Sequence, residues 1–131
     1  MKKSELLNSD LSYEISKMGH TQTILIGDCG LPIPSAVKRI DLAVKRGVPS
    51  FADILETVLS ELCVEKYIVA EELHFQNAAM EQYIKKTMGS IPSEVVSHEE
   101  LKKMSEHVVC IVRTGEASPY ANIILQSGVQ F

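Results

Sequence analysis

His20 is the residue of this sequence that most suggests proton transfer. It follows Gly19 in a short polar turn that also contains Thr21 and Gln22, and an imidazole is the side chain whose charge changes near neutral pH. The position fits a general acid or base, and it fits equally well a histidine that caps the preceding helix. The residues alone leave both interpretations open.

A second group of polar residues could bind the hydroxyl groups of a small ligand. His98 lies in Ser97-His98-Glu99-Glu100, a capping-box pattern that predicts a helix start, although the position alone favours a solvated first-turn residue. Lys102 follows one helical turn later on the same face, where a solvated lysine is the default. Tyr120 and Asn122 alternate across Ala121. In an extended segment their side chains would share one face, whereas the simpler alternative is a packed tyrosine and a turn asparagine.

Asp28 directly follows Thr23 to Gly27, an apolar, β-branched run that predicts a buried strand. Ligands of open α/β sheets usually bind outside the carboxyl ends of the strands, so the polar residues after each predicted strand are site candidates. They are Asp28, Glu71, Glu72, His98 and Thr114. His20 precedes this strand, and the loop before so short a strand could fold back toward Asp28.

The elements that must position these residues alternate along the chain. Further strands are predicted at 36–43, 66–70, 94–97, 107–113 and 122–125, and helices at 9–17, 51–62, 71–88 and 98–104. Such alternation predicts an α/β fold, with a central, mostly parallel sheet and helices on its faces. The 131 residues fit a single domain, 1–131, because one hydrophobic core is feasible at this length.

Composition excludes several classes of function. The formal net charge is −4 and no basic cluster exceeds two residues, so nucleic acid is not expected as a partner. No apolar stretch has the length of a membrane span or a signal peptide, so we expect no membrane contact and a cytoplasmic location. No histidine pair has the i, i+4 spacing of a helical zinc site, so no metal site is predicted.

The three cysteines do not suggest disulfides or catalysis. Their number is odd and their spacing wide, which fits reduced thiols, and Cys63 and Cys110 lie in apolar runs typical of core residues. Cys29 is a poor nucleophile candidate because the neighbouring carboxylate of Asp28 disfavours the thiolate. The glycines around Asp28 match neither a dinucleotide-binding nor a phosphate-binding loop, and no serine has a nucleophile-elbow pattern.

Several segments together resemble the ribose pyranase and fucose mutarotase family over nearly the whole chain. They are Gly19-His20, the run TILIGD that ends at Asp28, the loop Leu31 to Pro34, the segment Ser97 to Lys102, and the segment Gly115 to Asn122. The resemblance implies an α/β enzyme that interconverts the pyranose and furanose forms of D-ribose without a cofactor, which supplies ribose for phosphorylation.

The same resemblance implies roles for individual residues. His20 would be the catalytic proton donor, and Asp28, His98, Tyr120, Ala121 and Asn122 would bind the sugar. It further implies a homo-oligomer, a decamer of two pentameric rings with sites at subunit boundaries. Three alternatives stay open: a fucose mutarotase, a sugar-binding or transport-accessory protein without turnover, and a thiol-dependent enzyme that uses Cys29.

Overall fold

The strand that precedes Asp28 lies in the middle of a sheet that is covered on both faces. Its residues Ile24, Leu25 and Ile26 are fully buried. Ile24 and Ile26 belong to a cluster of 21 buried residues on one face, whereas Leu25 belongs to a cluster of 8 on the other. Because successive side chains of a strand point to opposite faces, each face of the sheet must carry its own apolar layer.

A computed structural model describes all 131 residues of the chain and contains one six-stranded sheet. Its strands are β1 (Thr23–Gly27), β2 (Lys38–Asp41), β3 (Val64–Ala70), β4 (Ser93–Val96), β5 (Cys110–Arg113) and β6 (Ile123–Ser127). Their order across the sheet is β2-β5-β1-β6-β3-β4. The pairs β2–β5, β1–β5 and β3–β4 are parallel, whereas β6 is antiparallel to both of its neighbours.

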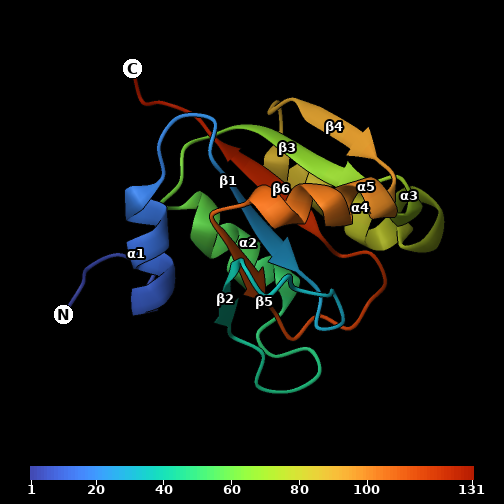
Figure 1. Cartoon of the computed structure of the whole chain (residues 1–131), viewed down its shortest axis with the longest axis horizontal. Helices are drawn as coiled ribbons and strands as arrows, with labels where there is room; N and C mark the ends of the chain where they lie inside the picture. The colour runs from blue at the N-terminus through green and yellow to red at the C-terminus, as the bar shows by residue number, and fades with distance from the viewer.

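Five strands therefore run in one direction and β6 runs against them, as the arrows in Figure 1 show. This confirms the prediction of a mostly parallel sheet in an α/β fold. The reversal of β6 matters for the site, because the residues just before β6 lie at the same edge as the carboxyl ends of the other strands.

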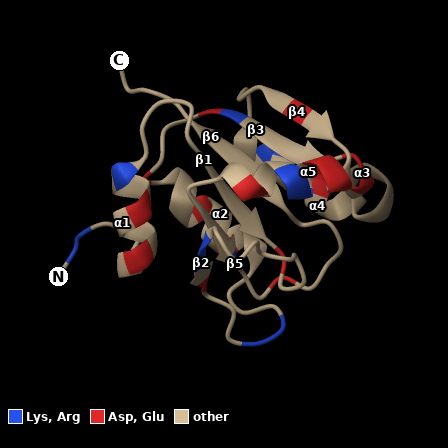
Figure 2. Ribbon diagram, viewed as in Figure 1, with Lys and Arg blue, Asp and Glu red and all other residues tan.

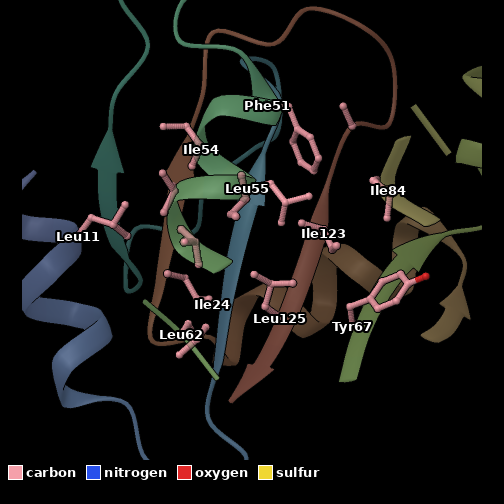
Figure 3. Packing of buried hydrophobic residues seen from close by; sticks show 14 of the residues in the cluster. Leu11, Ile24, Phe51, Ile54, Leu55, Leu62, Tyr67, Ile84, Ile123 and Leu125 are labelled. Carbon is pink, nitrogen blue, oxygen red and sulfur yellow. The ribbon is translucent and has the colours of Figure 1, made fainter. Parts of the chain in front are cut away.

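Helices cover both faces of the sheet. They are α1 (Ser9–Lys17), α2 (Phe51–Leu59), α3 (Glu72–Gln76), α4 (Ala78–Met88) and α5 (His98–Met104), followed by a 3₁₀ turn, η1 (Ser105–His107). On the face that carries the cluster of 21 buried residues, Phe51 and Leu55 of α2 pack over β1 and β6, as Figure 3 shows. On the other face, Leu101 of α5 packs against Leu25 and Ile68.

Local signals in the sequence set most helix ends. Asn8 caps α1 by accepting a hydrogen bond from the Leu11 N–H, and Ser50 and Asp53 form a reciprocal capping box at the start of α2. Ser97 caps α5 by accepting from the Glu100 N–H. Gly89 ends α4 with a φ of 58°, a conformation that glycine adopts without strain.

Several predicted elements need correction. The helix predicted at 71–88 is two helices, because Asn77 leaves the helical conformation to cap α4 and to donate its amide to Ser118 and Pro119. The strand predicted at 107–113 begins only at Cys110, after η1. The strand predicted at 36–43 is limited to 38–41, and the last strand runs from Ile123 to Ser127. The helix predicted at 51–62 ends at Leu59, with Ser60 as its C-cap.

The cysteine prediction is half right. Cys110 is fully buried, and burial raises the pKa of its thiol to about 12, whereas Cys63 is partly exposed and donates to the Val129 carbonyl.

None of the helices has the length and apolar character that crossing a bilayer requires. Basic and acidic residues are interspersed over the molecule in the view of Figure 2.

Candidate functional site

Asp28 and Asn122 are held together where β1 ends and β6 is about to begin. The Asn122 carboxamide accepts a hydrogen bond from the Asp28 N–H at 2.9 Å and donates one to Asp28 Oδ2 at 2.9 Å. Asp28 Oδ1 accepts from the Gly30 N–H. Gly27 has to lack a side chain here, because a Cβ would lie 2.9 Å from a Leu31 methyl and 3.1 Å from the Asn122 carboxamide oxygen. The carboxylate therefore has a fixed orientation at this edge.

His98 and Tyr120 form a second pair at the same edge. Their rings meet edge to face, with centroids 5.1 Å apart and an interplanar angle of 84°. Glu72, just after β3, accepts a hydrogen bond from the His98 backbone N–H at 2.9 Å and so fixes the start of α5. His98 Nδ1 is buried and has no hydrogen-bond partner within the chain. Buried polar groups without a partner are rare in native structures, so this nitrogen is available to a ligand or to a neighbouring chain.

A tight turn links the two pairs. Tyr120 has a φ of 57°, and the Asn122 N–H donates to the Tyr120 carbonyl at 2.8 Å, so of the two conformations that the sequence left open the segment adopts the turn and not the extended one. Ala121 is fully buried within a single chain. Lys102 forms an ion pair with Glu99, and that pair holds the pKa of the Glu99 carboxyl below its usual value.

His20 lies at the opposite edge of the sheet. The loop before β1 does not fold back toward Asp28, so the expectation that the two could meet within one chain is wrong. The turn is instead tied to the end of β6, because the Thr21 N–H donates to the Ser127 carbonyl at 2.9 Å and the Ser127 N–H donates to the Gln22 carbonyl at 2.8 Å. His20 Nε2 lies 3.0 Å from Glu65 Oε2.

Left-handed backbone marks both edges. Thr21, with a φ of 69°, and Tyr120 are the two non-glycine residues of the chain with positive φ. This conformation is unfavourable for residues with a side chain and persists only where the surrounding contacts impose it, most often at functional sites. One of the two follows His20 directly, and the other contacts His98.

The concave surface of the chain lies away from these residues. Two depressions are lined by residues of β3, β4, α3 and α4, such as Val69, Leu73 and Val95, and neither contains Asp28, His98 or Asn122. His74, in the first depression, is a surface histidine whose Nδ1 lies 2.9 Å from Glu81 Oε2. No three acidic, cysteine or histidine side chains converge as metal ligands would. A single chain thus leaves Asp28, His98 and Tyr120 partly exposed on an open edge, whereas Ala121 and Asn122 are buried.

Comparison with known proteins identifies the family. Residues 1–130 match the RbsD / FucU transport protein family. The D-ribose pyranase of Coprothermobacter proteolyticus is 54% identical over 131 residues, which cover the whole of both chains. The chain belongs to the RbsD / FucU family. The structure of Bacillus subtilis RbsD complexed with D-ribose is 41% identical, with a TM-score of 0.97 over 100% of both chains.

Within the RbsD / FucU family the same fold extends to more distant proteins. The fucose mutarotase of Streptococcus pneumoniae, solved in complex with L-fucose, has a TM-score of 0.81 at 22% identity and covers 100% of both chains. At that identity the likeness concerns the fold alone. The sequence prediction of a family resemblance over nearly the whole chain is confirmed.

Two residues of the candidate site were not predicted from the sequence. Glu65 belongs to no sequence motif and lies just before the strand predicted at 66–70, and Gln126 lies just beyond the last strand, predicted at 122–125. Glu65 lies near the amino end of β3 and Gln126 near the carboxyl end of β6. Because β6 runs antiparallel to β3, these two ends lie side by side, and their polar residues could have indicated a contact. The sequence alone does not show that β6 is antiparallel, so this contact could not be predicted from it.

Replacement of Asn122 by Ala is expected to weaken both stability and ligand binding. The variant removes the acceptor of the Asp28 N–H and the donor to its carboxylate at a fully buried position, which should cost about 1–3 kcal/mol of unfolding free energy. Urea unfolding measures the loss. Asn8→Ala, which removes the cap of α1, is the control: it should lower stability by about 1 kcal/mol without a change in KM for ribose. An unchanged KM in Asn122→Ala would contradict a binding role.

Proposed function

We propose that this chain is an enzyme that interconverts the pyranose and furanose forms of D-ribose. The observation that carries the proposal is the match, over the whole of both chains, to a D-ribose pyranase that is 54% identical. The likeness to Bacillus subtilis RbsD complexed with D-ribose supports the same sugar. The whole chain, 1–131, would act as one sugar-isomerising domain in the cytoplasm and would supply ribose for phosphorylation.

The sugar would bind at the edge that carries the two polar pairs. Asp28 and the Asn122 carboxamide offer fixed acceptors and donors for hydroxyl groups, and the unpaired His98 Nδ1 offers another. Tyr120 adds an aromatic surface and a phenol, and Ala121 contributes backbone groups. The carboxylate, carboxamide, imidazole and phenol of these residues lie at one edge of the sheet, and together they supply the hydrogen-bond donors and acceptors that a polyhydroxylated ligand requires.

His20 would reach this sugar from a neighbouring subunit. Within one chain the whole of β1 separates His20 from Asp28, and a strand of five residues spans about 16 Å, longer than a pentose. The open edge is consistent with a site that a second copy closes. Contacts between one edge of a subunit and the other edge of the next are heterologous and form a ring when the rotation closes. A decamer of two pentameric rings would satisfy this geometry.

The reaction needs only the movement of hydroxyl protons. In the proposed mechanism the His20 imidazolium donates a proton to the ring oxygen as its bond to C1 breaks, and that oxygen becomes a free hydroxyl. The anomeric hydroxyl loses its proton to a carboxylate or water as the C1 carbonyl forms. The 4-hydroxyl then adds to C1 and gives up its proton, while the carbonyl oxygen takes one up. No C–H bond breaks, and the protons balance over the cycle.

Saturation-transfer NMR on equilibrated D-ribose tests the proposed function directly. The native protein is expected to speed the exchange between β-pyranose and β-furanose signals well above the buffer rate. The same measurement on L-fucose anomers distinguishes a fucose mutarotase. Binding of ribose without any faster exchange would refute the enzyme and favour a sugar-binding or transport-accessory protein, a class that the family description also names.

A further inference from the structure

We infer that Glu65, held by Gln126, is a positioning residue that orients the His20 ring and fixes which of its nitrogens faces the sugar. The inference rests on the proposed function, in which His20 is the proton donor. Glu65 Oε2 lies 3.0 Å from His20 Nε2, and the Gln126 amide donates to Glu65 Oε1 at 2.6 Å. The three side chains come from the loop before β1, from β3 and from β6.

A β-bulge in β3 directs the Glu65 side chain toward His20. The register between β3 and β6 shifts between Val64, which faces Ser127, and Lys66, which faces Gln126, so Glu65 is the extra residue of a β-bulge. A bulge re-aims a side chain out of the regular alternation of a strand and is frequent near active sites. In a regular strand Glu65 would pair with a residue of β6, whereas in the bulge it has no paired residue there.

The turn that carries His20 is equally constrained. The Gly19 N–H donates to the Gln22 side-chain oxygen at 2.6 Å, and the Gln22 N–H donates back to the Gly19 carbonyl at 3.2 Å. Thr21 is held in its left-handed conformation by the backbone hydrogen bond to Ser127. The same end of β6 therefore anchors both the His20 turn and, through Gln126, the carboxylate.

The hydrogen bonds assign the His20 nitrogens. Donation from Gln126, and then from His20, holds the pKa of the Glu65 carboxyl below its usual value, so the group is a carboxylate at neutral pH. A carboxylate only accepts hydrogen bonds, which requires that His20 Nε2 carries a proton. His20 Nδ1 makes no hydrogen bond within the chain and is left to exchange the catalytic proton with the sugar. A carboxylate that fixes an imidazole in this way is a recurrent device in acid–base catalysis.

Stability does not account for the pair. The His20 side chain is 54% exposed and that of Glu65 is 36% exposed. Exposed ion pairs add little to folding because water and salt screen them. Glu65→Gln should therefore leave unfolding by urea close to that of the native protein, and its effect should appear in turnover.

The test compares kcat and KM, obtained from ribose exchange rates at several ribose concentrations, in three variants. Glu65→Gln is expected to lower kcat by about 10-fold to 100-fold with little change in KM, because Glu65 acts on His20 Nε2 and not on the nitrogen that would face the sugar. Glu81→Gln is the matched control, since Glu81 holds His74 in a similar pair at 2.9 Å, and it should leave kcat unchanged. His20→Ala provides the reference for a lost proton donor. NMR of ¹⁵N-labelled histidine should show the Nε2–H tautomer of His20 in the native protein and lose it in Glu65→Gln.

The outcomes separate this inference from the proposed function. If His20→Ala loses activity and Glu65→Gln keeps the native kcat or changes only KM, Glu65 does not position His20. If His20→Ala keeps activity, the proposed role of His20 fails instead. If Glu65→Gln does not assemble, Gln126→Ala is the alternative variant, because it keeps the Glu65 carboxylate and removes only the hydrogen bond to Glu65 Oε1. A loss of kcat between that of the native protein and that of His20→Ala supports the inference, and a native kcat overturns it.

Discussion

Ribose exchange catalysed by the His20→Ala variant is expected to fall by about 10²-fold to 10⁴-fold, the usual contribution of one general acid or base. The reason is chemical: the ring oxygen leaves C1 more readily if it receives a proton as the bond breaks. Since ribose opens slowly without a catalyst, the remaining rate should approach that of buffer. Saturation transfer between the β-pyranose and β-furanose signals measures the loss.

A second histidine provides the control for this variant. His74 is 64% exposed and bonded to a glutamate, as His20 is, but it lies in α3 and away from the polar cluster. His74→Ala should therefore exchange ribose at the native rate, and size-exclusion chromatography should show the same assembly for both variants. Native activity in His20→Ala would show that another group donates the proton.

Much of the fold was predictable because its signals are local. The run TILIG identified β1 with its observed ends, and the capping-box pattern at Ser97 identified the start of α5, since a cap depends only on the next few residues. The break at Asn77 was not predictable, because it depends on hydrogen bonds to Ser118 and Pro119, about forty positions later in the chain. Tertiary contacts of this kind override local helix preference.

The candidate site was predictable only in part. Asp28 and His98 follow parallel strands, so the general rule for α/β sheets placed them at one edge. The sequence left both an extended segment and a turn open around Tyr120, because a positive φ is unusual for a residue with a side chain and no local pattern predicts it. The place of His20 was also misjudged. Whether a loop before a strand folds back depends on partners such as Ser127 and Glu65, whose positions follow from the direction of β6.

Two inactive variants are expected to restore activity when they are combined in one assembly. His20→Ala lacks the proposed proton donor, and Asp28→Ala lacks the carboxylate that the sugar would contact. These residues lie at opposite edges of one chain, so a boundary between an Asp28→Ala subunit, which supplies His20, and a His20→Ala subunit, which supplies Asp28, is complete. With random mixing of equal amounts across a heterologous ring, about one quarter of the boundaries are of this kind.

The two variants can be produced together with different tags, and mixed assemblies isolated by sequential affinity steps. Ribose exchange should then rise from the buffer level of either parent to roughly a quarter of the native rate, in proportion to the complete boundaries. Two differently tagged copies of His20→Ala, mixed in the same way, should stay inactive. Mixed assemblies no more active than their parents would mean that each chain builds its site alone, which requires the His20 turn to leave Glu65 and cross the length of β1.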